Sequence, residues 1–230
     1  MPNHGYLPAP FTTEDYRTRT AHIDVIGGAV VSGSFQGFDQ SYLLDALGAL
    51  GAGFVGVTQL PVDVADAEVL SLSAAGVRAV RFNLRRGGPV TLEHLDRLAR
   101  RVHDLAGWHS ELYLDAADLP DLAPTLSPLP QVSIDHLGLS RAGLPHLLRL
   151  VEHGARVKAS GLGRGDLDLA SALRAIAQVS PTALMVGTDL PSTRAPRPFD
   201  DADLDLVRDT LGTDLAHAAF QDNALALYRP

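Results

Sequence analysis

The sequence predicts an α/β fold, a (β/α)8 barrel of which seven strands are visible. Short runs rich in Val, Ile and Leu alternate with longer segments of helical periodicity, a pattern typical of parallel βαβ units. The predicted strands are apolar almost throughout, as strands buried on both faces of a parallel sheet are. The length of 230 residues suits one such barrel, so we expect a single domain over residues 1–230.

The elements follow an irregular, proline-rich first stretch that ends at about Thr20. Strands are expected at Asp24–Val31, Phe54–Gln59, Val77–Asn83, Glu111–Asp115, Gln131–Asp135, Arg156–Ser160 and Ala183–Thr188. Helices are expected at Asp39–Leu50, Val64–Ala75, Thr91–Leu105, Ser140–His153, Asp166–Val179, Asp201–Leu211 and Asp214–Tyr228. Glycine accepts the left-handed conformation that ends helices, and the expected ends carry Gly51, Gly76, Gly107, Gly154 and Gly212. The expected N-caps are Thr91, Ser140 and Asp166.

An open doubly wound sheet is the alternative to a barrel, but it would usually have fewer strands. Gly161-x-Gly163-x-Gly165 follows a predicted strand, yet it lacks the spacing of a dinucleotide-binding fingerprint. The barrel with one strand absent therefore fits the pattern better.

Composition and charge exclude several classes of function. A formal net charge of -8 disfavours nucleic acid as a partner, because phosphate backbones repel an acidic protein. The absence of cysteine excludes disulfides, thiolate metal sites and a cysteine nucleophile. No apolar stretch approaches the roughly 20 residues of a membrane-spanning helix, and the N-terminus has no signal-peptide pattern. We expect a cytoplasmic protein that does not bind membranes.

Polar side chains lie at the end of every predicted strand, which is where parallel barrels carry their chemistry. Asp189 could act as a general base toward water, or it could simply be a turn residue before Pro191. His136 could act beside it, although a lone histidine is more often structural. Lys158 is a minor candidate for Schiff-base chemistry. The full set is Ser32, Ser34, Gln59, Arg81, Asn83, Tyr113, Asp115, His136, Lys158, Ser160 and Asp189.

A basic cluster and three absent motifs narrow the chemistry further. The arginines could hold a carboxylated ligand or could form a solvated loop. No Gly-x-Ser-x-Gly elbow is present, which disfavours a serine hydrolase. Neither a His-x-His pair nor a His-Glu-x-x-His helix is present, so the sequence contains no recognisable zinc site. The arginines of the cluster are Arg78, Arg81, Arg85 and Arg86.

The strings at the strand ends resemble the amidohydrolase-related family, in the branch of 2-pyrone-4,6-dicarboxylate lactonase and the sugar lactonases. The resemblance covers nearly the whole chain in the same order, and the Val-Arg-Phe-Asn-Leu and Gly-Thr-Asp-Leu-Pro strings are fairly specific to this branch. The matching pieces are Ser32–Asp39, Gly76–Leu84, Ile134–Gly138, Val157–Gly161, Val186–Pro191 and Asn223–Tyr228.

The resemblance implies a TIM barrel of the metal-dependent hydrolase type and assigns roles to several residues. It makes Asp189 the group that activates the attacking water, and His136 the group that polarises or positions the substrate carbonyl. It implies that lactonases of this branch work without a metal, whereas other members of the superfamily need one or two. The residues that it places around the substrate are Arg81, Tyr113, Arg164, Ser34 and Gln59.

The chain departs from the family at its start, because the family opens with a strand ending in His-x-His that is absent here. The first residues, MPNHGY, resemble the loop that follows this strand in relatives. One hypothesis is a misassigned start codon, which translation of the upstream DNA would test. A barrel without this strand has two unpaired edges, so self-association into a homo-oligomer is an expectation. A divalent metal such as Zn²⁺ remains open for a form that carries the strand.

The sequence therefore predicts a hydrolase that opens a lactone, or a similar C–O or C–N bond, in a small carboxylated or sugar-derived ring. Two alternatives remain open. The first is a non-catalytic truncated barrel that serves as a binding or interaction protein. The second is a metal-dependent amidohydrolase or decarboxylase.

Overall fold

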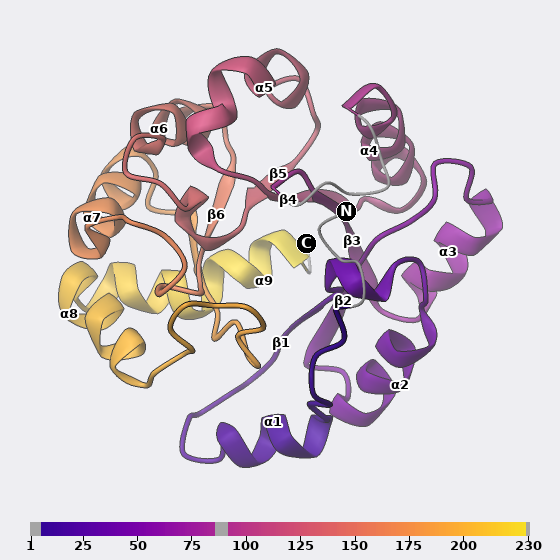
Figure 1. Ribbon diagram of the computed structural model, residues 1–230, viewed down its shortest axis with the longest axis horizontal. Helices are drawn as coiled ribbons and strands as arrows, with labels where there is room; N and C mark the ends of the chain where they lie inside the picture. The colour runs from indigo at the N-terminus through magenta and orange to yellow at the C-terminus, as the bar shows by residue number, and fades with distance from the viewer. Residues whose placement is uncertain (1–5, 86–91, 229–230) are drawn as a thin grey trace. The chain divides into compact units, whose positions relative to one another are not determined.

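The computed structural model describes residues 6–85 and 92–228, drawn in colour in Figure 1. The chain divides into two compact units between Glu111 and Leu112, and each is described by itself. Arg86, the expected N-cap Thr91 and the MPNHG start lie outside the described residues.

The first unit contains three parallel strands and begins a fourth. β1 pairs with β2 and β2 with β3, so neighbouring strands follow one another in chain order. The helices that alternate with these strands lie on their outer side in Figure 1. The elements are α1 (Thr13–Arg19), β1 (Gly28–Val31), the 3₁₀ turn η1 (Ser34–Gln36), α2 (Ser41–Leu50), β2 (Phe54–Thr58), α3 (Asp66–Ala74), β3 (Val77–Asn83), α4 (Leu92–Ala106) and β4 (His109–Tyr113), whose last two residues enter the second unit.

The second unit repeats the same alternation. β5 pairs with β6 and β6 with β7, again parallel and in chain order. The elements are the 3₁₀ turn η2 (Ala116–Asp118), α5 (Leu119–Leu126), β5 (Val132–Ile134), the 3₁₀ turn η3 (His136–Gly138), α6 (Leu144–Glu152), β6 (Arg156–Ala159), α7 (Leu169–Val179), β7 (Leu184–Val186), α8 (Ala202–His217), the π turn η4 (Ala218–Asp222) and α9 (Asn223–Tyr228).

All seven predicted strands are present, so the α/β class is confirmed. The bounds of most of them differ from the prediction. β1 begins at Gly28 and not at Asp24, and β4 begins two residues earlier than predicted, at His109. β5 and β7 have three residues each, because the chain turns away at the polar residues that were assigned to their ends.

Several helix boundaries differ from prediction for identifiable reasons. Ser140 does not cap α6, which begins after Gly143; its Oγ instead accepts a hydrogen bond from the Gly143 N–H at 3.2 Å. Asp166 does not cap α7 either. That role belongs to Asp168, whose Oδ1 accepts the Ser171 N–H at 2.8 Å. In both cases the residue that was predicted as the N-cap lies in the loop before the helix.

Two further differences concern the ends of the chain. The predicted irregular start contains α1, whose N-cap Thr12 forms a capping box with Asp15. The predicted helix Asp201–Leu211 and the first turn of the predicted helix Asp214–Tyr228 form one helix, α8. It continues past Gly212 with a kink at that residue, where φ is +72°. α9 then begins at Asn223, whose buried amide donates hydrogen bonds to the carbonyls of Pro181 and Leu184 and so ties the last helix to β7.

The sheet of the second unit has two unlike faces. Strand alternation places Val132, Ile134, Val157 and Ala159 on the same face, and all four side chains are buried. The opposite face is polar, which is unusual for a buried parallel sheet. It carries Ser133, Asp135, Arg156, Lys158 and, directly after β6, Ser160.

Candidate active site

Four of the predicted site residues come together at the carboxyl ends of β4 to β7 in the second unit. Tyr113 is the last residue of β4, and His136 begins the turn that follows β5. Arg164 lies in the loop after β6, and Asp189 lies three residues after β7. The structure thus brings these four side chains to one end of the strands of this unit, while their roles in a reaction stay a prediction.

Asp189 is held in one orientation by Arg164. The Arg164 Nε donates to Asp189 Oδ2 at 2.6 Å, and its Nη2 donates to the Thr193 carbonyl at 3.0 Å. The two side chains are 8% and 15% exposed respectively, so water screens this ion pair only weakly. Asp189 itself takes a φ of +59°, a conformation that non-glycine residues rarely adopt. The second carboxylate oxygen, Oδ1, points away from the guanidinium toward His136.

His136 faces that second oxygen across a short gap. Its Nε2 lies 3.9 Å from Asp189 Oδ1, too far for a hydrogen bond. Its Nδ1 lies 3.2 Å from both the carbonyl oxygen and the hydroxyl oxygen of Ser160. A carbonyl can only accept, so Nδ1 carries the hydrogen, and Nε2 is the nitrogen left to take up or give a proton. The Tyr113 ring packs edge-on against the imidazole, with centroids 5.4 Å apart.

Gly161 lies against the side chains of Asp189, His136 and Arg164, and its lack of a side chain leaves room for them. A Cβ at this position would lie 2.7 Å from both Asp189 Oδ2 and His136 Nδ1, and 2.8 Å from Arg164 Cδ. Its φ of +55° also favours glycine.

The two other glycines of the Gly-x-Gly-x-Gly string lie against neighbouring loops. A Cβ on Gly163 would lie 2.6 Å from Arg197 Cβ, and one on Gly165 would lie 1.9 Å from the Leu139 carbonyl oxygen. The string therefore forms a close-packed loop. Glycine at every second residue directly after a predicted strand is the sequence signal that could have identified Gly161 as a site residue.

The predicted residues of the first unit gather around the Ser32–Gly37 loop. Arg81 Nη1 donates to the Ser32 carbonyl at 2.7 Å, and Gln59 Nε2 donates to the Gly33 carbonyl at 3.0 Å. Ser34 is the first residue of η1 in the same loop. The contacts of Arg81 and Gln59 shape the loop, and the role of all three residues in substrate binding stays a prediction.

Tyr42 also belongs to this region, because its hydroxyl forms a hydrogen bond with Ser32 Oγ. Burial raises the pKa of Tyr42 to about 12, so the phenol stays protonated at neutral pH. It can therefore serve as a hydrogen-bond donor in the loop but not as a base.

Comparison with known proteins assigns the chain to a family. The amidohydrolase family model (Amidohydro_2) matches residues 1–229. The chain belongs to the amidohydrolase family. This confirms the resemblance inferred from the strand-end strings, and it confirms the predicted hydrolase class at the level of the family.

Two curated relatives of this amidohydrolase carry names that involve lactones. A 2-pyrone-4,6-dicarbaxylate hydrolase of Comamonas testosteroni is 32% identical over 140 residues, which is 60% of this chain and 46% of that relative. The match thus spans about half of that relative's length. A D-galactarolactone isomerase of Agrobacterium fabrum is 27% identical over 246 residues, with 98% of this chain and 82% of that relative covered.

A solved structure supports the fold over nearly the whole chain. A Pseudomonas putida protein whose name places it among the 2-pyrone-4,6-dicarboxylic acid hydrolases is 29% identical, with a TM-score of 0.82, and covers 97% of this chain and 88% of its own. The predicted fold class, an amidohydrolase barrel with seven visible strands, is confirmed.

Amidohydrolases typically use a metal ion, but the donors among the described residues do not fit one. In residues 6–85 and 92–228, no three His, Cys, Asp or Glu side chains converge on a point where an ion could bind. His136 and Asp189 supply two donors, and the Arg164 guanidinium already occupies Asp189 Oδ2, where a second cation would be repelled. We therefore assign no step of the reaction to a metal.

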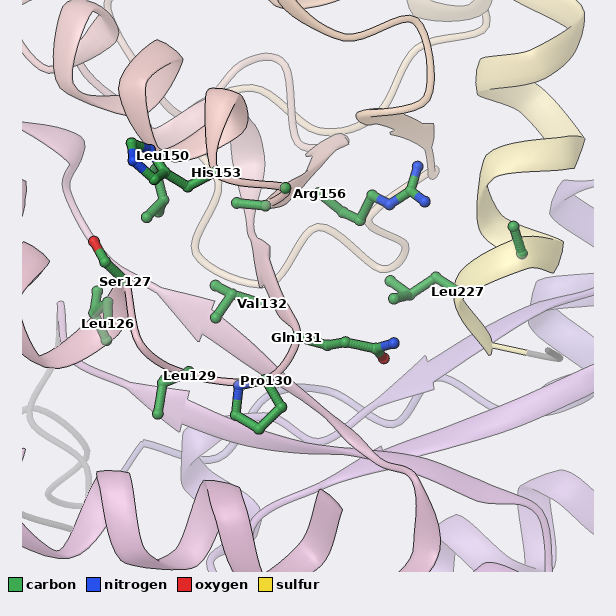
Figure 2. A pocket seen from close by; sticks show the side chains of 13 residues that line it. Leu126, Ser127, Leu129, Pro130, Gln131, Val132, Leu150, His153, Arg156 and Leu227 are labelled. Carbon is green, nitrogen blue, oxygen red and sulfur yellow. The ribbon is translucent and has the colours of Figure 1, made fainter. Parts of the chain in front are cut away.

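A separate hollow of about 200 Å³ lies at the opposite ends of the strands (Figure 2). Val132 opens β5 and Arg156 opens β6, and both line it, so it lies at the amino ends of these strands. His136 and Asp189 follow the carboxyl ends of β5 and β7 and do not line it. This hollow is therefore not the candidate active site.

Proposed function

We propose that this amidohydrolase opens the ring of a small carboxylated or sugar-derived lactone, with Asp189 as general base. The observation that carries the proposal is the orientation of Asp189. Arg164 holds one carboxylate oxygen at 2.6 Å, which leaves the other directed toward His136 Nε2 across 3.9 Å. A base and a second proton-carrying group that face one small space are the parts that ester hydrolysis by water needs.

The reaction follows from these positions. A water molecule gives a proton to Asp189 Oδ1 as its oxygen attacks the ring carbonyl carbon. The carbonyl oxygen gains negative charge, which a protonated His136 Nε2 stabilises by donating a hydrogen bond. The bond between the carbonyl carbon and the ring oxygen then breaks, and the ring oxygen receives the proton held by Asp189. The product is the open-chain hydroxy acid, and the base returns to its starting state.

The names of the relatives support a lactone as the substrate class, because one is a pyrone-dicarboxylate hydrolase and another a galactarolactone isomerase. The second name also favours a second candidate function, movement of the ester bond within a sugar lactone. That relative aligns with 98% of this chain. Isomerisation would need the same carbonyl and the same base, with a substrate hydroxyl in place of water.

A panel of small lactones tests the proposal. Carboxylated pyrones and aldarolactones are incubated with the protein, with and without a chelator, and the products are separated by chromatography. We expect open-chain acids to form at a rate that the chelator does not change. Isomeric lactones would indicate the second candidate. A folded protein that binds carboxylates without turnover would favour the binding-protein alternative, and loss of activity with chelator would favour the metal-dependent one.

The role of Arg164 can be separated from substrate binding. Because its Nε and Nη2 are committed to Asp189 and Thr193, we expect Arg164→Met to lower kcat roughly 10- to 100-fold while KM changes little. Arg164→Lys should recover part of kcat. The exposed Arg208→Met is the matched control and should leave both constants unchanged. A large rise in KM confined to carboxylated substrates would instead support the substrate-binding role that the family resemblance implies.

We further propose that the protein acts in the cytoplasm on a small molecule, without nucleic-acid or membrane partners. In residues 6–85 and 92–228, no helix is both long and apolar enough to cross a membrane. The net charge of -8 disfavours binding to nucleic acid. Self-association and the organisation of residues 1–230 as one domain stay predictions. Gel filtration over a range of concentrations tests the first of these.

A further inference from the structure

We infer that Lys158 and Asp135 form a buried ion pair that positions His136, an inference that rests on the proposed function for its effect on catalysis. Lys158 Nζ lies 3.4 Å from Asp135 Oδ1. The two side chains are 12% and 3% exposed. Neither residue takes part in the proposed reaction itself, and the effect of both on catalysis passes through His136.

The register of the sheet makes this pair a cross-strand neighbour. Ser133 pairs with Arg156 and Ile134 with Val157, so the next step along the two strands places Asp135 opposite Lys158. Directly opposed side chains in a sheet lie on the same face and contact one another. The pair therefore forms where β5 ends and the turn that carries His136 begins.

The turn after β5 needs firm anchors because its backbone is strained. His136 and Leu137 each have a φ of +53°, and Leu139 has a φ of +69°, values that side-chain-bearing residues rarely adopt. Asp135 fixes the start of this turn through its backbone. Its N–H donates to the Leu112 carbonyl at 2.9 Å, and its own carbonyl accepts the Gly138 N–H at 3.1 Å. The ion pair adds a third attachment through the side chain.

Lys158 of β6 and Ser160, which directly follows β6, contact two successive residues, Asp135 and His136. Lys158 and Ser160 are two residues apart, so they lie on the same face of the sheet. Lys158 contacts Asp135, and Ser160 contacts the Nδ1 of the next residue, His136. The position of the imidazole relative to β6 is therefore set by two consecutive contacts, of which the ion pair is the first.

Stability alone gives no reason for such a pair. Two buried charges lose their hydration, and replacing a buried ion pair by apolar residues of similar size is often neutral or stabilising. Removing one partner, in contrast, leaves the other charge buried and takes away the attraction between the two, which is destabilising. A role in fixing the direction of Asp135, and through it His136, accounts for the presence of the two buried charges.

The test uses single and double replacements. Lys158→Met and Asp135→Leu should each lower Tm, since each removes one charge of the pair and leaves the other buried, while the double variant Lys158→Met/Asp135→Leu should fold with a Tm near that of the original protein. If the pair positions His136, the double variant keeps its KM within about 3-fold and loses roughly 10- to 100-fold in kcat on the lactone that the panel identifies. Lys158→Arg, which keeps the charge, should retain more kcat than the double variant.

A second measurement does not depend on activity. The ring ¹⁵N signals of His136, identified by their loss in His136→Gln, should shift in the double variant because the Nδ1 contact with Ser160 changes. The control Asp205→Leu/Arg208→Met removes an exposed pair and should alter neither kcat nor these signals. A double variant with wild-type kcat and unshifted His136 signals would overturn the inference. If no lactone is turned over by the original protein, the proposed function fails, and the ring signals still decide whether the pair positions His136.

Discussion

Asp189→Asn should lower kcat/KM by about 10²- to 10⁴-fold, the range that loss of a general base produces. Asparagine has nearly the shape of aspartate, and its carbonyl oxygen can still accept the Arg164 N–H, so the loop should keep its conformation. What is lost is the ability of the group facing His136 to take a proton from water. Steady-state kinetics on the lactone found by the panel, with far-ultraviolet circular dichroism to verify folding, measures the effect.

The matched control for this variant is Asp168→Asn. Asp168 caps α7 in the same unit, and asparagine is as good an N-cap as aspartate. Neither activity nor Tm should change. Retention of more than about a tenth of the activity in Asp189→Asn would show that another group takes the proton, because a general base contributes at least about 10²-fold.

Gly161→Ala should abolish most of the activity through crowding. The new methyl group would lie 2.7 Å from Asp189 Oδ2 and from His136 Nδ1, so both side chains must move. A displacement of about 1 Å in such a group can cost roughly 10²-fold in rate. The φ of +55° adds a backbone cost of roughly 1–2 kcal/mol to the free energy of unfolding.

Gly154→Ala separates these two effects. Gly154 lies in the same unit, has a φ of +95°, and a Cβ there would meet nothing within 4 Å. We expect it to lower the free energy of unfolding by a similar amount in urea titrations while kcat stays unchanged. If both variants lose activity equally, backbone strain and not contact with Asp189 and His136 explains the loss.

The sequence predicted best those elements whose signal is local. β3 was predicted with both ends correct, because its apolar residues, Val77 to Phe82, begin directly after the helix-ending Gly76. α5 was missed because Pro120 and Pro124 interrupt its pattern. Pro120 stands in the first turn, where its missing N–H has no helical partner in any case, so a short helix tolerates it. α1 carried a readable signal in its Thr12-x-x-Asp15 capping box. The prolines around it nevertheless led to the prediction of an irregular segment.

For the candidate site, the strand ends identified the residues but not their partners. Asp189 and His136 were predicted from their positions after predicted strands. That Arg164 would bind Asp189 depends on where two loops meet, which no local pattern encodes. The need for glycine at position 161 has the same origin, because the atoms that exclude a side chain come from His136, Arg164 and Asp189 together.

The close-packed loop after β6 restricts how this protein could acquire a new substrate. Replacement of Gly161, Gly163 or Gly165 by any other residue would bring its Cβ too close to a neighbouring residue. Directed evolution of substrate range should therefore find few acceptable changes at these three positions. The turn at Gly37 is different, since a Cβ there would meet nothing within 4 Å and the constraint is the φ of +58° alone. Residues that tolerate this conformation, asparagine and aspartate above all, give library design its starting point in that loop.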